Sequence, residues 1–152
     1  MPDCLNAGQL RIGRYSEPGR LYLLTSVVHQ RQPLFTDWRL GRLVVRELQL
    51  TQEDGWADLL TWVVMPDHLH CLVQLREKTL AEVMCRIKSR SGLAVNQVLG
   101  RRGRLWQKGY HDRAIRREED VKSIARYIVA NPIRAGLVKR VHDYPLWDAC
   151  WL

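Results

Sequence analysis

Long hydrophobic runs are missing from this sequence. The longest apolar stretches, 21–24 and 62–65, are far shorter than the roughly 20 residues of a membrane-spanning helix. The N-terminus has no succession of basic, apolar and small residues, so we expect no signal peptide and no membrane partner. Repeats, low-complexity tracts and linkers are also missing. The 152 residues therefore predict one domain, 1–152, with enough length for a hydrophobic core.

Paired cysteines are missing as well. The cysteines are scattered, at Cys4, Cys71, Cys85 and Cys150. No Cys-x-x-Cys pair occurs, which argues against a zinc knuckle or a disulfide framework. Such usage is typical of the reducing cytosol, so we expect a cytoplasmic protein, associated with the nucleoid if it binds DNA.

Acidic residues are missing between Glu82 and Asp112, in a chain whose formal net charge is +8. The cations of this stretch are Arg86, Lys88, Arg90, Arg101, Arg102, Arg104 and Lys108. A second basic group consists of Arg11 and Arg14 in an N-terminal arm, 1–19, and Arg20 directly after it. Patches of a single sign are typical of phosphate-binding surfaces, so DNA is the expected partner. Solubility alone, with a merely solvated arm, is the alternative.

Hydrophobic periodicity and turn residues predict the secondary structure. Strands are expected at 21–28, 57–65 and 68–75, with short extended segments at 104–107 and 110–115. Helices are expected at 38–50, from 80 to Gly100 and from 121 to Asn131, before a C-terminal tail, 143–152. This order predicts an α+β domain with helices packed on one face of a mainly antiparallel central sheet. The strand 68–75 is expected at its centre.

Residues typical of helix ends mark some of these boundaries. Thr79 and Glu82 form a capping-box pattern before the second helix. The pair 91–92, Ser-Gly, can interrupt that helix. Pro132 disfavours helical geometry in the residue before it, so the third helix is expected to end at Asn131.

Two histidines flank one apolar residue at the start of 68–75. Side chains on a strand alternate between its faces, so His68 and His70 share one face. Neighbouring imidazoles on a rigid strand suit one metal ion, although a partly buried polar pair without metal is the alternative. Two ligands leave a metal site incomplete. The candidates for a third ligand are His29, His111, His142 and Asn131.

Tyr127 and Asn131 stand four residues apart and so on one face of the last long helix. In the functional interpretation, Tyr127 is a nucleophile and the amide oxygen of Asn131 joins the two imidazoles as a metal ligand. Tyrosine ionises at about pH 10, and a basic surround would favour the phenolate. In the alternative, Tyr127 is a half-buried aromatic residue and Asn131 caps the helix.

Several segments in this order resemble the REP-associated tyrosine transposases. They are GRYSEPGRLYLLTS (13–26), RQPLF (31–35), MPDHLH (65–70), WQKGYHDR (106–113) and YIVANPIRAGLV (127–138). These proteins belong to the HUH single-tyrosine superfamily, the IS200-like transposases. The resemblance covers about 13–147, and the combination of segments is what makes it specific.

The resemblance implies a ferredoxin-like sandwich, the HUH transposase fold. It also implies a metal-dependent single-stranded DNA endonuclease that nicks and rejoins REP-like hairpins through a 5′-phosphotyrosine intermediate. His68 and His70 match the metal ligands of the family, Tyr127 matches its nucleophile, and Asn131 matches the third ligand. Related transposases often carry the longer glutamine at this third position.

The identity of the metal depends on the third ligand. Two imidazoles alone would suit zinc, whereas an added amide oxygen and phosphate oxygens suit Mg²⁺ or Mn²⁺. The resemblance also implies Mg²⁺ or Mn²⁺. Such an ion would polarise the scissile phosphate.

Three residues of segment 106–113 have two interpretations each. Arg113 can hold a phosphate near the site or form an ordinary surface ion pair. Trp106 and Tyr110 can stack on unpaired bases or pack in the core, and the core is favoured for Trp106.

Two other functions fit the same residues. One is a catalytically inactive, sequence-specific protein that binds DNA hairpins through its basic surface. The other is a metal-dependent phosphodiesterase that uses water, with Tyr127 in a structural role. A covalent protein–DNA adduct would distinguish the transposase from both. The sequence leaves open whether the protein is a monomer or a homodimer.

Overall fold

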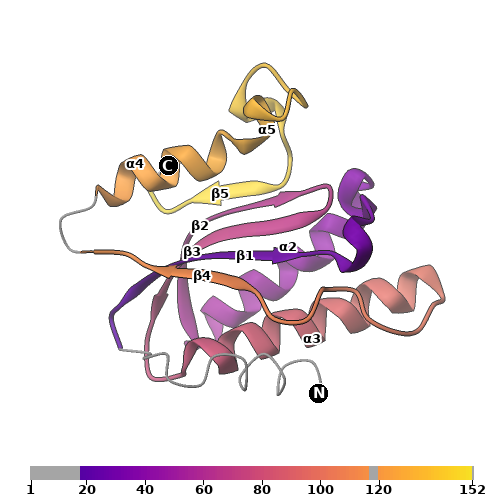
Figure 1. Ribbon diagram of the computed structural model, residues 1–152, viewed down its shortest axis with the longest axis horizontal. Coiled ribbons are helices and arrows are strands. Elements are labelled where there is room, and N and C mark those ends of the chain that lie inside the picture. The colour runs from indigo at the N-terminus through magenta and orange to yellow at the C-terminus, as the bar shows by residue number, and fades with distance from the viewer. Residues whose placement is uncertain (1–17, 117–119, 152) are drawn as a thin grey trace.

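The computed structural model describes residues 18–116 and 120–151 (Figure 1). The strands are β1 (Leu21–Val27), β2 (Ala57–Met65), β3 (His68–Leu75), β4 (His111–Ala114) and β5 (Trp147–Ala149). The α-helices are α2 (Trp38–Glu53), α3 (Leu80–Leu99), α4 (Val121–Val129) and α5 (Asn131–Arg134). Short 3₁₀ turns lie at His29–Arg31, Leu34–Thr36 and Val141–Asp143. Arg11 and Arg14 lie outside the described residues.

The strands form one antiparallel sheet in the order β4-β1-β3-β2-β5. The α+β class and the central position of the histidine strand are therefore confirmed. A Pro-Asp turn joins β2 to β3, so that Met65 pairs with His68. The segment 104–107 is not a strand, and only Trp106 makes a single bridge, to Val28.

The helix α3 begins at the predicted capping box and ends at Gly100, whose φ of 64° closes it in the left-handed region. The predicted interruption at 91–92 is wrong. The Ser91 hydroxyl is fully buried, donates to the Ile87 carbonyl at 2.6 Å and accepts from Trp106 Nε1 at 2.9 Å. These bonds satisfy a polar side chain that would otherwise favour leaving the helix.

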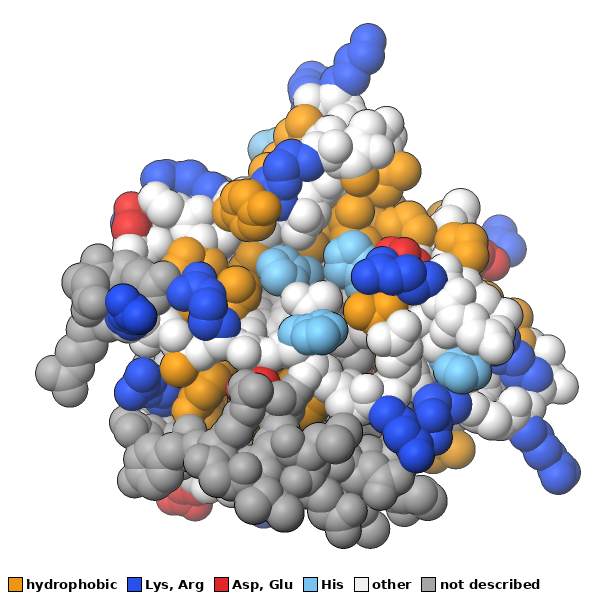
Figure 2. All heavy atoms as spheres, viewed as in Figure 1, with side chains coloured by type: hydrophobic (Ala, Val, Ile, Leu, Met, Phe, Trp, Pro, Cys, Tyr) orange, Lys and Arg blue, Asp and Glu red, His pale blue; other side chains and the backbone are white. Residues whose placement is uncertain are grey.

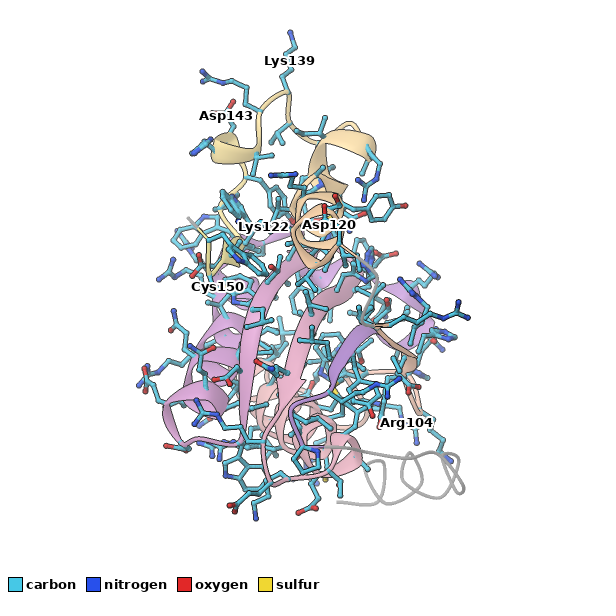
Figure 3. All side chains as sticks on the ribbon, turned by 90° about the vertical axis from the view of Figure 1, so that its left-hand side faces the viewer. Arg104, Asp120, Lys122, Lys139, Asp143 and Cys150 are labelled. Carbon is cyan, nitrogen blue, oxygen red and sulfur yellow. The ribbon has the colours of Figure 1, made fainter. Side chains whose placement is uncertain are left out.

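The third helix is shorter than predicted. The carboxylate of Asp120 accepts hydrogen bonds from the main-chain N–H groups of Lys122 and Ser123 and so begins α4, which Figure 3 shows nearly end-on. The helix ends at Val129, and Asn131 opens the separate short helix α5. Pro132 lies in the first turn of α5, where a missing N–H costs little.

The C-terminal tail is part of the sheet. Trp147–Ala149 pairs with Thr61–Val63 of β2 as the edge strand β5. Just before it, Leu146 packs on Gly41 of α2. None of the helices described between residues 18 and 151 is long and apolar enough to cross a membrane.

The helices cover both faces of the sheet, and the predicted packing on one face is wrong. The helices α2 and α3 contact each other and bury the face of Leu69, Cys71 and Val73. The helix α4 contacts β2, β3 and β5. The opposite face, called the histidine face, carries His68, His70 and Leu72 of β3 together with Thr61 of β2, which pairs with Leu72. Thr61 and Leu72 are fully buried. Figure 1 shows α4 apart from α2 and α3. The last long helix therefore lies on the same face as the histidines.

Candidate active site

His68 and His70 lie side by side on the histidine face of β3, and β1 runs beside them. In the sheet register, Val27 pairs with His68 and Thr25 pairs with His70. Figure 2 shows histidine side chains gathered near the middle of this face, with Lys and Arg side chains around them. The strand alternation predicted from the sequence is confirmed.

Each imidazole is fixed through its Nδ1 atom. The Thr25 hydroxyl lies 2.6 Å from Nδ1 of His70, and Oδ1 of Asp67 lies 2.8 Å from Nδ1 of His68. An ionised carboxylate can only accept, so the proton of a neutral His68 sits on Nδ1 and its Nε2 keeps the lone pair. Neighbours of this kind orient the ring of a metal-binding histidine. Each ring is therefore held at Nδ1 by a neighbouring side chain.

The charge states of His70 and Asp67 are compatible with metal binding at the histidine pair. Burial, followed by the charges of His68 and Arg134, lowers the pKa of His70 to about 4. His70 is therefore neutral at pH 7, which is the form that binds metal ions. Burial alone would raise the pKa of Asp67, but hydrogen bonds and charge from His68 and Arg31 outweigh it and lower the pKa. The carboxylate beside His68 is therefore ionised.

Tyr127 and Asn131 lie close together but on different helices. Tyr127 is on α4 and its side chain is 61% exposed, whereas Ala125 and Ile128 on the other side of the helix are buried. Asn131 is half-buried at the start of α5. The predicted helix face is thus interrupted at Ala130, although the two residues remain neighbours.

Arg134 connects these two residues. Its Nη2 atom donates to Oδ1 of Asn131 at 2.6 Å and to the main-chain oxygen of Tyr127 at 2.7 Å. Its guanidinium carbon lies 3.7 Å from the centre of the Tyr127 ring. The sequence analysis missed this residue. The contact with Asn131 could have been predicted from the spacing of the two residues, because residues at i and i+3 of a helical turn lie close together.

The other candidate ligands differ in position. Thr25 pairs with His70 on one side and with His111 of β4 on the other, so His111 lies on the histidine face across one strand. His29 lies in a 3₁₀ turn, and His142 packs edge-on against Trp147 at 6.0 Å. Within 18–116 and 120–151, no three His, Cys, Asp or Glu side chains come together as a metal cluster. His68, His70 and His111 therefore lie on the histidine face, and Asn131 lies at the start of α5.

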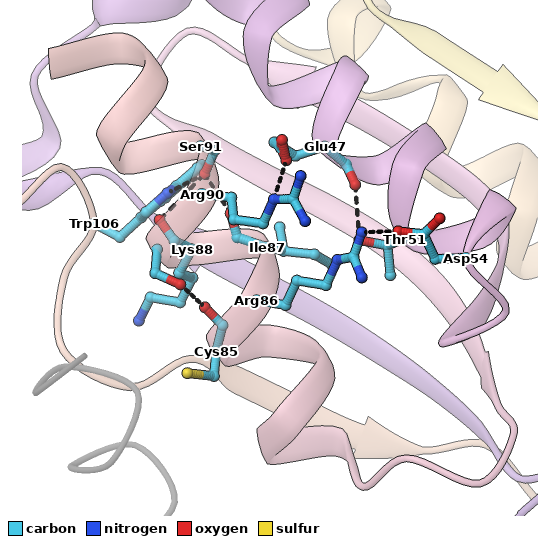
Figure 4. A network of polar contacts seen from close by, with 11 residues as sticks. Glu47, Thr51, Asp54, Cys85, Arg86, Ile87, Lys88, Arg90, Ser91 and Trp106 are labelled. Atoms are coloured by element: carbon cyan, nitrogen blue, oxygen red, sulfur yellow. Dashed lines mark hydrogen bonds and ion pairs between the residues drawn. The ribbon is translucent and has the colours of Figure 1, made fainter. Parts of the chain in front are cut away.

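The cations of α3 do not face the histidines, because α3 covers the other side of the sheet. Lys88 is only 4% exposed, and its ammonium donates to the carbonyls of Gln107 and Gly109 at 2.8 and 2.7 Å. The prediction that Lys88 contacts DNA is therefore wrong. Arg86 pairs with Asp54, which caps the C-terminal end of α2, and Arg90 pairs with Glu47 of α2 at 3.1 Å (Figure 4). These two residues join the helices α2 and α3 to each other.

Other predicted DNA contacts lie nearer the histidines. Arg113 is exposed and pairs in register with Leu23, which puts it on the histidine face. Lys108 lines a cavity of about 230 Å³ together with Thr25 and His111. Arg102 is exposed, Arg20 and Arg104 are half-buried, and Arg101 donates to Gln32 and Asn96. Lys108 and Arg113 are thus the best-placed cations of the predicted set.

Trp106 and Tyr110 are not available for stacking on bases. Trp106 is 3% exposed and packs on Phe35, with ring centres 5.7 Å apart. Tyr110 is 7% exposed. Both belong to the hydrophobic core, as favoured for Trp106.

Comparison with known proteins gives matches over most of the chain. A family model described as "Transposase IS200 like" matches residues 20–131. The REP-associated tyrosine transposase of Escherichia coli K12 is 27% identical over an alignment of 140 positions, which covers 87% of this chain and 78% of that protein. The range of the family match contains His68, His70, Tyr127 and Asn131.

Solved structures with a similar fold give the same result as the sequence comparisons. The structure of a REP-associated tyrosine transposase bound to a REP hairpin matches with a TM-score of 0.71 and 26% identity, over 88% of this chain and 79% of that one. A Deinococcus radiodurans R1 protein, 19% identical, has the same fold with a TM-score of 0.54, over 76% of this chain and 90% of its own. The fold and the family match together show that this chain belongs to the IS200-like transposases.

Proposed function

We propose that this protein cuts and rejoins single-stranded DNA, with Tyr127 as the nucleophile and a divalent ion held by His68, His70 and Asn131. The observation that supports the proposal is the position of α4, which lies on the sheet face that carries the two oriented imidazoles. Family membership supports the class of reaction.

The donor set fits a hard divalent ion. Two imidazole nitrogens and one amide oxygen, with DNA oxygens completing the shell, suit Mn²⁺ or Mg²⁺. When bound, the ion would polarise the scissile phosphate. The Thr25 and Asp67 side chains keep the two rings oriented for it.

The reaction is an exchange of one phosphodiester bond for another. The phenolate oxygen of Tyr127 attacks the phosphorus, the bond from phosphorus to the 3′-oxygen breaks, and that oxygen leaves and takes up a proton. The products are a 5′-phosphotyrosine link and a free 3′-hydroxyl. Attack by a 3′-hydroxyl of another strand reverses the step and releases Tyr127. No bond energy is lost, so the protein can rejoin what it cuts.

The proposed substrate is a palindromic repeat that folds into a hairpin. A similar protein is named a REP-associated tyrosine transposase, and a similar structure contains a REP hairpin. Exposed Lys108 and Arg113 beside the histidines are suited to the phosphates of an adjoining single strand.

The decisive experiment traps the adduct. The protein is incubated with a labelled hairpin oligonucleotide and Mn²⁺, digested with protease, and analysed by mass spectrometry. We expect DNA attached to Tyr127, no adduct in excess chelator, and no adduct from Tyr127→Phe, which should still bind the hairpin. DNA attached to Tyr22 or Tyr110 would refute the assignment. Tight binding without any adduct would instead favour the catalytically inactive hairpin-binding protein, and cleavage without an adduct would favour hydrolysis by water.

A further inference from the structure

Arg134 occupies the oxygen that the proposed metal site needs. Its Nη2 atom lies 2.6 Å from Oδ1 of Asn131, which is a short, charge-assisted hydrogen bond. The same atom donates to the main chain of Tyr127, and the guanidinium lies over the ring of that residue. One cation therefore contacts both the candidate third ligand and the candidate nucleophile.

A guanidinium and a divalent ion compete for this amide oxygen. Both are attracted to the same partial negative charge, and two cations within a few ångströms repel each other. The hydrogen bond thus opposes the binding of metal by Asn131. Arg134 is exposed, so its side chain has room to turn away without unfolding either helix.

A phosphate offers Arg134 a stronger partner than an amide oxygen. Arginine binds phosphate through two parallel hydrogen bonds, with charge on both sides of the contact. In the proposed reaction, the DNA phosphate that Tyr127 attacks lies beside the last turn of α4, which is also where Arg134 lies. The partner that would move the guanidinium is thus the substrate of the proposed reaction.

We propose that Arg134 is a positioning residue that masks the Asn131 oxygen at rest and releases it when a DNA phosphate takes the guanidinium. The inference rests on the proposed function. It makes metal binding and DNA binding cooperative, because each ligand favours the arrangement that the other needs.

The test measures Mn²⁺ binding directly, by the loss of the electron paramagnetic resonance signal of the free ion. All proteins carry Tyr127→Phe, which keeps the ring under Arg134 and prevents strand cleavage. Without DNA, adding Arg134→Ala should tighten Mn²⁺ binding by about fivefold or more. A single-stranded oligonucleotide should tighten binding in the Tyr127→Phe protein, and this effect should shrink when Arg134→Ala is present.

Two further variants separate the hydrogen bond from simple charge. Arg126→Ala removes the same charge from an exposed position of α4 and should change Mn²⁺ affinity much less. Arg134→Lys keeps the charge but loses the planar fork, so it should lie between the parent and Arg134→Ala. Equal shifts from Arg126→Ala and Arg134→Ala, or no shift from Arg134→Ala, would overturn the masking role alone.

The proposed metal site has its own control in the same experiment. His68→Ala should abolish Mn²⁺ binding. If binding survives His68→Ala, or if no variant binds Mn²⁺, the metal site itself is refuted and the masking role falls with it. The two failures are therefore distinguishable.

Discussion

At the scale of single residues, the histidine pair depends on side chains that would not themselves touch a metal. Thr25 contacts His70 because β1 and β3 pair them directly in register. Asp67 contacts His68 because it ends the turn that β3 follows. Such outer contacts commonly change metal affinity by about 10- to 100-fold when they are removed.

Thr25→Val tests this dependence. The substitution keeps the shape of the side chain and removes the hydroxyl that holds Nδ1 of His70, so Mn²⁺ affinity should fall by about tenfold. Isothermal titration calorimetry would measure it. Thr61→Val is the matched control, since Thr61 is buried on the same face and its hydroxyl has no hydrogen-bond partner among the described residues. Equal affinities for the two variants would contradict the orienting role of Thr25.

Some of these residue-level features follow from the sequence and others do not. The shared face of His68 and His70 is predictable, because strand alternation is a local rule. The burial of Lys88 is not predictable, because the sequence does not show which way a lysine side chain points. Its partners, Gln107 and Gly109, also come from a distant loop. The bridge from Arg134 to Tyr127 depends on how α5 turns after α4, which also lies beyond local periodicity.

At the scale of elements, Gly41 illustrates a close approach between segments far apart in the chain. Glycine usually weakens a helix, by about 1 kcal/mol relative to alanine. A Cβ atom at this position would collide with the Leu146 side chain, which is 1% exposed and cannot move freely. The glycine of α2 therefore makes room for the segment that leads into β5.

Gly41→Ala should consequently destabilise the protein despite its better helix propensity. Overpacking costs about 1–3 kcal/mol, which exceeds the gain of about 1 kcal/mol. The free energy of unfolding from urea titration measures the balance. Gly92→Ala on α3 is the control, because a Cβ there would lie 3.7 Å from Leu105, an ordinary contact. Stabilisation by both substitutions would show that Leu146 adjusts without cost.

Tyr144 links the segment that leads into β5 to strand β2 by a hydrogen bond. Its hydroxyl donates to the Val64 carbonyl at 2.6 Å, and burial raises its pKa from 10.0 to about 12. Below about pH 10 the phenol is neutral in both the folded and unfolded states. Above it the unfolded state ionises first, so stability should fall as the pH rises from about 10 towards about 12.

Tyr144→Phe should remove the part of the stability loss above about pH 10 that comes from ionisation of this phenol. It should also lower the free energy of unfolding at pH 7 by about 1 kcal/mol, because the Val64 carbonyl loses its donor. Urea titrations of both proteins at pH 8 and pH 11 would give the difference. If the variant loses as much stability between these pH values as the parent, the ionisation of Tyr144 is not linked to folding.

The main elements of the fold are predictable, but the short ones are not. Strands β2 and β3 have the predicted bounds, since long apolar runs and clear turns mark them. Strand β5 has three residues, too few for a periodic pattern. The side of the sheet that α4 covers also escaped prediction, because its amphipathic pattern states which face is buried but not against what.

At the scale of the whole molecule, the positive charge divides between two faces of the sheet. Lys108 and Arg113 lie with the histidines, whereas Arg42 and Arg46 are exposed on α2, which covers the other face. The net charge of +8 therefore does not describe the DNA-binding surface by itself.

Removing the two pairs of cations separately tests the division. Lys108→Ala with Arg113→Ala should weaken binding of a single-stranded oligonucleotide. The slope of log affinity against log salt should also become shallower, by about 0.7 for each lost phosphate contact. Arg42→Ala with Arg46→Ala removes the same charge and should leave the slope nearly unchanged. Fluorescence anisotropy at several salt concentrations would measure both, and equal slopes for the two double variants would indicate only a general attraction.

The two border strands of the sheet are short. Strand β4 has four residues, two of which are Asp112 and Arg113, and β5 has three. Sheet borders are where separate chains can join by main-chain hydrogen bonding, and short charged borders discourage this. Two copies of this protein therefore have only short edge strands along which their sheets could join into one continuous sheet. Growth into fibrils by that route is expected to be slow, even in concentrated solution.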